Sequence, residues 1–144
     1  MTERRDPRGS VKGYDFNDVT SQIIGAAIEV HKELGPGFQE VTYQRALAKE
    51  LAARGLDFSR EVDVPIHYKG EKIDTRRVDF VVEDCVVEIK ARSELLPQDF
   101  VQAVSYLRAS GYPLGLLINF GAKSAEFRRF VNTKRKRELR ESGE

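Results

Sequence analysis

The stretch at residues 76–92 (RRVDFVVEDCVVEIKAR) constrains the fold of this chain more than any other. Apolar residues alternate with mostly polar ones on both sides of Glu83-Asp84, and a period of two is the pattern of a β-strand. A turn at this dipeptide predicts an antiparallel hairpin that pairs Val82 with Cys85 and, further from the turn, Asp79 with Glu88. The residues predicted for its apolar face are Val78, Phe80, Val82, Cys85, Val87 and Ile89.

The predicted register brings two carboxylates face to face. Directly opposed residues have Cβ atoms about 4.5–5.5 Å apart, and like charges in such positions destabilise a sheet. Lys90 shares the face of Asp79 and Glu88 and can offset the repulsion. A hard divalent cation such as Mg²⁺, which prefers carboxylate oxygens, can also do so. The motif alone leaves open a third interpretation, an exposed sheet face with a surface ion pair.

Length and composition predict one soluble domain. A chain of 144 residues is long enough for a hydrophobic core. Its net charge of +1 means that nucleic-acid binding would need a local cluster of cations. A single cysteine, Cys85, excludes an internal disulfide and a cysteine-based zinc site, and we expect its thiol to be buried. No apolar run reaches the ~20 residues of a membrane helix, so we expect a cytoplasmic protein without a membrane partner.

The first half of the domain is predicted to be helical. Residues 1–13 are charged and without period, and are interpreted as a flexible arm. A helix is predicted from about residues 15–18 to Leu34, where Gly35 and Pro36 end it. His31, in its last turn, is given a structural role at the helix C-terminus rather than a catalytic one. A second helix is predicted over residues 38–54 with Tyr43, Leu47 and Leu51 inward.

Glu40 lies at the head of that inward stripe. An acid in this position can complement the positive end of the helix. It can instead point across the core toward the hairpin and serve a site. The helix pattern leaves both alternatives open.

The second half is predicted to be a sheet with one further helix. Residues 56–68, 71–82 and 85–92 are predicted to form an antiparallel meander, and Pro65 favours an edge strand or a bulge in its first strand. A helix over residues 97–110 carries Val101, Val104 and Leu107 on one face. Residues 113–120 (PLGLLINF) predict a strand buried on both faces and parallel to the third. Residues 123–132 fit either a short helix or a final edge strand, and residues 133–144 are predicted to be a charged tail.

The expected fold is therefore α/β, a mixed β-sheet flanked by helices in the order α-α-β-β-β-α-β. We place it in a single domain over residues 14–132, with the polar face near Asp79 opening into a cleft.

A family resemblance is carried by residues 37–43 (GFQEVTY), which match the motif of the GxxExxY family. The segments VHKELGPGFQE, VDFVVEDCVVEIKA and GYPLGLLINFG resemble that family too, and the likeness covers roughly residues 15–132. The family is similar to the PD-(D/E)XK nuclease superfamily. The resemblance thus implies a restriction-endonuclease-like core, which agrees with the order of elements above.

The resemblance also implies roles for individual residues. Asp79 and Glu88 would be the metal-binding acids, Lys90 the lysine of the motif, and Glu40 an acid from the preceding helix. Residues Gln102 and Tyr106, four apart on the later helix, resemble a Gln-x-x-x-Tyr element that binds substrate.

The chain departs from the superfamily pattern in two places. Arg77-Val78 stands where a proline often precedes the aspartate, and residues 98–100 lack a histidine–glutamate pair. The second departure leaves the substrate contacts open.

The sequence-based hypothesis is a Mg²⁺-dependent nuclease that hydrolyses phosphodiester bonds of nucleic acid, with DNA as partner and Mn²⁺ as an alternative cofactor. The ion would lie between Asp79 and Glu88, with the Ile89 carbonyl as a further ligand. Lys90 would orient water or stabilise charge on the phosphate. The arginines and lysine considered for phosphate contacts are Arg76, Arg77, Arg92 and Lys123.

Two other functions compete with this hypothesis. The chain can be a non-catalytic module that binds nucleic acid or protein, or an interaction protein whose charged tails recruit a partner. Retention of Asp79, Glu88 and Lys90 favours the enzyme. The sequence leaves the oligomeric state open, with a homodimer among the alternatives.

Overall fold

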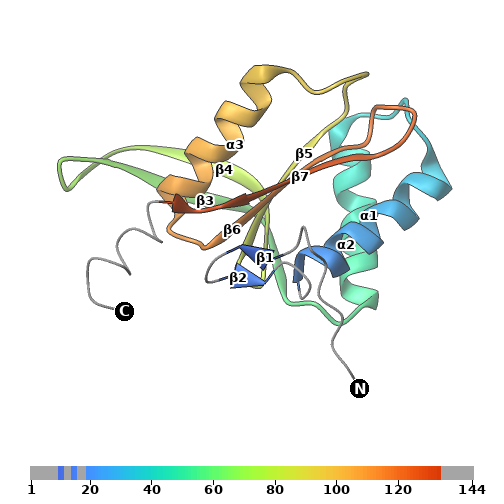
Figure 1. The fold of residues 1–144 in the computed structure, drawn as a ribbon, viewed down its shortest axis with the longest axis horizontal. Helices are drawn as coiled ribbons and strands as arrows, with labels where there is room; N and C mark the ends of the chain where they lie inside the picture. Colours follow the sequence, from blue (N-terminus) through green and yellow to red (C-terminus); the bar gives the residue numbers. More distant parts are fainter. Residues whose placement is uncertain (1–9, 12–13, 16–18, 134–144) are drawn as a thin grey trace.

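The computed structural model describes residues 10–11, 14–15 and 19–133. Their centre is a five-stranded mixed sheet in the order β3-β4-β5-β6-β7, covered by helices (Figure 1). The strands are β3 (Phe58–Tyr68), β4 (Glu71–Val82), β5 (Cys85–Lys90), β6 (Leu114–Asn119) and β7 (Glu126–Val131). The helices are α1 (Val19–Leu34), α2 (Glu40–Ala53) and α3 (Pro97–Ser110). This α/β arrangement confirms the predicted fold class.

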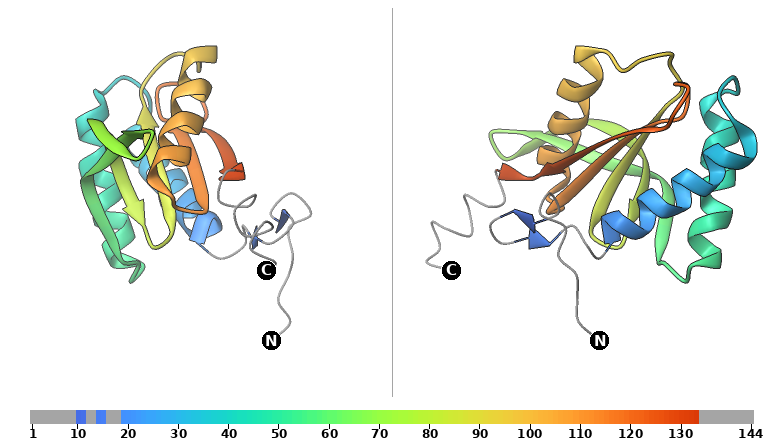
Figure 2. Two further views of the ribbon diagram at one scale, coloured as in Figure 1. Left: turned by 90° about the vertical axis from the view of Figure 1, so that its left-hand side faces the viewer. Right: turned by 45° about the vertical axis from the view of Figure 1, so that its right-hand side comes forward.

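The helices form separate layers on the two faces of the sheet (Figure 2). Buried side chains of α1 and α2, among them Ile23, Tyr43 and Leu47, pack with Phe80 and Val87 of the sheet. Leu107 of α3 belongs to a second cluster with sheet valines. Apolar stripes at helical spacing explain this burial, because each helix covers the sheet through one face only.

The pairing around β5 agrees with the sequence prediction. β4 and β5 pair antiparallel through Phe80–Val87, Val81–Val86 and Val82–Cys85. β5 and β6 pair in parallel, so α3 is the crossover between them. Cys85 is buried with a free thiol, as expected.

The two edge strands of the sheet, β3 and β7, test the predictions for Pro65 and for residues 123–132. β3 carries Pro65 and is an edge strand, with a register shift between Ile66 and His67. β7 pairs antiparallel with β6 at the other edge. The strand alternative for residues 123–132 is therefore correct. The β3–β4 hairpin projects well beyond the rest of the sheet (Figure 1, green).

The prediction for the N-terminal region was wrong in part. α1 begins at Val19, after two short strands, β1 (Ser10–Val11) and β2 (Tyr14–Asp15), that pair antiparallel. Asp15, within the range predicted for the start of this helix, therefore lies in a strand. The rest of the predicted arm, residues 1–9 and 12–13, and residues 134–144 of the predicted tail lie outside the described residues.

Val78 packs on the opposite face of the sheet from its predicted one. It joins Val64, Val81 and Leu107 beneath α3, whereas Phe80 packs beneath α1 and α2. The β3–β4 ladder pairs Arg60 with Phe80 and Val62 with Val78 but omits the pair between them. At this point Glu61, on the neighbouring strand β3, has a φ of 51°, a left-handed conformation that interrupts the regular pleat of β3.

The face of α3 predicted to carry Val101, Val104 and Leu107 is only partly buried. Val101 is 66% exposed and Val104 36%, whereas Asp99, Ala103 and Leu107 are buried. The helix is rotated so that its polar first turn faces the sheet.

No helix among the described residues is both long and apolar enough to cross a membrane.

Candidate metal centre

The two predicted acids meet where β4 and β5 diverge. Beyond Phe80–Val87 the strands no longer pair directly, and side chains complete the hydrogen bonding. Glu88 Oε1 accepts from the Asp79 N–H at 3.0 Å, and Asp79 Oδ2 accepts from the Ile89 N–H at 2.7 Å. The structure therefore brings Asp79 and Glu88 together, as the register predicted, and holds both carboxylates in place.

Both acids have raised pKa values because they are withdrawn from water. Glu88 is 7% exposed, and burial raises its pKa to about 8, with the negative charge of Asp79 acting in the same direction. Burial also raises the pKa of Asp79, against the lowering effect of its hydrogen bond from Ile89. A cation at this point would favour the ionised form of both groups.

Lys90 lies between these acids and α3. Its Nζ donates to Gln102 Oε1 at 3.2 Å and is 4.0 Å from Asp99 Oδ1. Its positive charge lowers the pKa of both Asp79 and Glu88. Gln102 Nε2 in turn donates to Tyr106 Oη at 3.3 Å, so the predicted Gln-x-x-x-Tyr pair is joined to the lysine through hydrogen bonds.

Glu40 approaches the same place from another layer. It is the first residue of α2, and partial burial raises its pKa, opposed first by the charge of Lys90. The Asp79 charge raises that pKa further. The glutamate is thus close enough to the acids and the lysine to feel their charges, which favours the second of the two alternatives left open by the sequence.

The predicted phosphate contacts are mostly engaged elsewhere. Arg92 Nε is 3.0 Å from Asp99 Oδ2. Arg77 is on the exposed side of the β3–β4 hairpin, with its Nε 3.2 Å from Asp63 Oδ1, and Arg76 pairs with Asp74.

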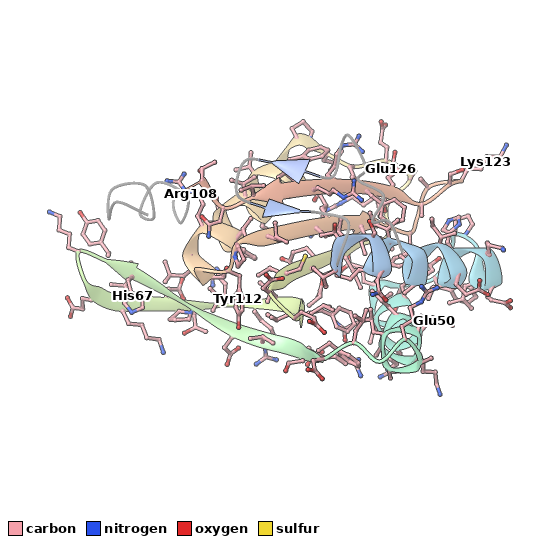
Figure 3. All side chains as sticks on the ribbon, turned by 60° about the horizontal axis from the view of Figure 1, so that its bottom comes forward. Glu50, His67, Arg108, Tyr112, Lys123 and Glu126 are labelled. Carbon is pink, nitrogen blue, oxygen red and sulfur yellow. The ribbon has the colours of Figure 1, made fainter. Side chains whose placement is uncertain are left out.

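Lys123 lies apart from the acids. It lines a shallow groove with Lys32 between α1 and the β6–β7 loop. Figure 3 shows it at the opposite end of the molecule from His67 on the hairpin. His31 lines the same groove, and its Nε2 is 3.0 Å from the Ala122 carbonyl. This histidine therefore ties the end of α1 to that loop, which is a structural role.

Comparison with known families identifies the superfamily to which this fold belongs. A model of the PD-(D/E)XK nuclease superfamily matches residues 17–130. The chain belongs to this superfamily. Nucleases of the PD-(D/E)XK type generally use divalent metals. Searches of curated proteins and of solved structures found no match, and the narrower GxxExxY resemblance stays a prediction.

Sequence reasoning missed Gln44, which contacts Asp79 from α2. Its Nε2 donates to Asp79 Oδ1 at 3.4 Å, and its Oε1 accepts from Arg60 Nη2 at 2.6 Å. The side chain is 7% exposed. The spacing of four residues from Glu40 places both on one helix face, and this was the available signal.

Asn119 was missed as well, and it fixes the strand end that carries Lys90. Its Oδ1 accepts from the N–H groups of Arg92 and Gly121, and its Nδ2 donates to the Arg92 carbonyl. A Cβ on Gly121 would lie 2.4 Å from the Arg92 nitrogen, so only glycine permits this approach. The signal was a polar residue at the end of a buried apolar strand.

The donor set fits a hard divalent cation. Among the described residues no three His, Cys, Asp or Glu side chains form a metal-binding group. Mg²⁺ requires only one or two carboxylates, because water fills its remaining positions. The charges acting on Glu40 are those of Asp79, Asp99, Lys90 and Arg92. With Glu40 and Glu88 ionised, the four carboxylates exceed the two cations and leave a negative centre, which suits a metal ion.

Proposed function

We propose that this PD-(D/E)XK protein is a divalent-metal-dependent nuclease that hydrolyses phosphodiester bonds, with DNA as substrate. The observation that carries the proposal is the pair formed by buried Glu88 and half-buried Asp79, with the charge of Lys90 acting on both acids. A negative centre repels a phosphodiester. A site of this kind therefore suits nucleic acid only with a cation present.

Asp79 and Glu88, with the Ile89 carbonyl, are the groups proposed to hold Mg²⁺ or Mn²⁺. Such an ion, when bound, polarises a phosphate and lowers the pKa of water. Holding it requires both carboxylates to be ionised, so Glu88 must lose the proton that burial favours.

Lys90 is proposed to place its ammonium beside the scissile phosphate, where it stabilises developing negative charge. Its hydrogen bond to Gln102 and the Gln102–Tyr106 contact keep the long side chain extended along α3. Glu40 is proposed to hold water at the α2 side of the site. Arg77 is exposed on the hairpin and remains a proposed contact to a more distant phosphate.

The domain proposed to carry this activity spans residues 14–132, between the N-terminal arm and the charged tail. We propose that it acts in the cytoplasm. A homodimer is a further proposal, which size-exclusion chromatography with light scattering would test.

Cleavage by the Lys90→Ala variant tests the proposed role of the lysine. We expect Mg²⁺-dependent degradation of labelled DNA by the parent, and a rate lower by about 10²–10³-fold in the variant, the usual effect of losing one charge-stabilising donor. Titration calorimetry should show that Mn²⁺ binding persists. Lys49→Ala, an exposed lysine on α2, is the matched control. Loss of metal binding together with activity would assign Lys90 a different role.

The acids are tested by the double variant Asp79→Ala, Glu88→Ala. We expect both Mn²⁺ binding and cleavage to disappear, because no carboxylate of the pair remains. Mn²⁺ binding as tight as that of the parent would end the metal proposal. Parallel cleavage assays with single-stranded DNA, double-stranded DNA and RNA would identify which nucleic acid is the substrate.

A non-catalytic binding module is the second candidate. It is favoured by the hydrogen bonds that occupy the acids, since an oxygen of each carboxylate already accepts a backbone N–H. Binding of nucleic acid without cleavage, equal with Mg²⁺ and with EDTA, would support this candidate over the nuclease.

A further inference from the structure

Asp99 is a buried acid that the sequence analysis did not single out. It lies in the first turn of α3, and only 2% of it is exposed. Its Oδ2 accepts from the Leu96 N–H at 2.9 Å, which satisfies one free donor at the start of the helix. That bond needs one oxygen and no net charge. It therefore does not explain a carboxylate withdrawn from water.

Both oxygens of Asp99 face cations of the β5 end. Arg92 Nε is 3.0 Å from Oδ2, and Lys90 Nζ is 4.0 Å from Oδ1. The Lys90 side chain is 16% exposed and that of Arg92 38%. Gln102, one turn further along α3, accepts from the same Nζ. The Lys90 ammonium thus lies near two oxygens of α3, one from the charged carboxylate of Asp99 and one from the neutral amide of Gln102.

Lys90 has a competing set of partners on its other side. Its charge acts on Asp79, Glu88 and Glu40. With no acid on α3, the flexible lysine would move toward the Asp79–Glu88 pair and neutralise it. A negative charge on α3 opposes that movement because it attracts the ammonium from the opposite direction.

We propose that Asp99 is a positioning residue that keeps Lys90 beside the acid pair rather than bound to it, and that anchors Arg92. The inference deepens the proposed nuclease function and assigns Arg92 a structural partner in place of a phosphate. It explains why the first turn of α3, rather than its exposed valines, faces the sheet.

The first test observes the parent protein and needs no catalysis. Hydrogen exchange of the Lys90 ammonium and the Arg92 Nε–H is measured by nitrogen-detected NMR, with the exposed Lys49 and Arg45 as references. We expect both groups to exchange at least about tenfold more slowly than the references, because Lys90 is hydrogen-bonded to Gln102 and both cations lie in ion pairs with the buried Asp99. Exchange as fast as at Lys49 and Arg45 would overturn the proposal.

The second test separates charge from helix capping. Asp99→Asn keeps an oxygen that can accept from the Leu96 N–H but loses the charge. Asp99→Glu keeps the charge, and glutamate at this helix position can also accept from that N–H. We expect Asp99→Asn to lower kcat by about 10- to 100-fold with little change in KM, a usual effect of losing a supporting partner. Asp99→Glu should retain more activity, and exchange at Lys90 should accelerate only in Asp99→Asn.

Asp74→Asn is the matched control, because Asp74 forms an exposed pair with Arg76 on the hairpin. Unchanged kcat and unchanged exchange in Asp99→Asn would reduce Asp99 to a cap and end the proposal. A parent that cleaves no nucleic acid with any metal would end the proposed function instead. The exchange rates would still decide the role of Asp99.

Discussion

At the scale of single residues, the centre is organised by acids that perform two tasks. Asp79 and Glu88 close the hydrogen bonding of two diverging strands, and they place negative charge where little water reaches. The first task fixes their geometry and the second raises their pKa values. The same carboxylates are therefore both structural groups and candidate metal ligands.

The raised pKa of Glu88 predicts how stability depends on pH. Its value of about 8 in the folded chain exceeds the ordinary 4.5, so folding favours the protonated acid. This contribution is fully present below about pH 4.5 and is lost as the pH rises through about 8, an effect on the order of a few kcal/mol. Urea unfolding of the metal-free protein between pH 5 and 8.5 measures it.

The Glu88→Gln variant should flatten that profile, because the amide does not titrate. Glu71→Gln, at an exposed position of the hairpin, should keep the slope of the parent. A parent whose unfolding free energy stays constant across this range would contradict the burial argument.

At the scale of the elements, α3 supplies more to the centre than its apolar pattern suggested. Its first turn holds Lys90 and Arg92 through Asp99, and Leu107 anchors it on the sheet. Val101 and Val104 face outward. On the other side, α2 contributes Glu40 and Gln44 from its first two turns. The centre is thus assembled from two helix N-termini and two neighbouring strands, β4 with Asp79 and β5 with Glu88 and Lys90.

This orientation of α3 predicts unequal costs of truncating its valine and leucine. Leu107→Ala should lower the unfolding free energy by about 2–5 kcal/mol, because it removes a side chain that is 1% exposed. Val101→Ala should change it by less than about 0.5 kcal/mol, as is usual for exposed positions. Chemical unfolding of both variants measures these costs, and equal losses would contradict the observed orientation of α3.

At the scale of the whole molecule, the charges are distributed unevenly. The chain has a net charge of +1, yet with Glu40 and Glu88 ionised the described part of the centre places four carboxylates against Lys90 and Arg92. Attraction of nucleic acid therefore cannot come from a uniform positive field. Metal binding would remove the repulsion between the carboxylates. The free energy of unfolding would then depend on the metal concentration.

That linkage predicts stabilisation of the folded chain by Mn²⁺ or Mg²⁺. A ligand that binds only the folded state at a hundred times its Kd adds about 2.7 kcal/mol, so thermal unfolding should shift upward with metal concentration. The double variant Asp79→Asn, Glu88→Gln should show no such shift. An identical shift in both proteins would locate metal binding elsewhere in the chain.

The sequence by itself determined the local structure and the opposition of the two acids. Period-two alternation about Glu83-Asp84 set the β4–β5 register, and Gly35 ended α1 with a φ of 69°. These features depend on neighbours in the chain, which the sequence displays directly. The superfamily match over residues 17–130 agrees with the resemblance seen there.

Only the tertiary structure decided which side chains surround those acids and how deeply they are buried. Val78 packs on the opposite face of the sheet from Phe80, and the rotation of α3 brings Asp99 against Lys90 and Arg92. Burial and charge depend on segments far apart in the sequence. The raised pKa of Glu88 therefore arises only once the chain has folded.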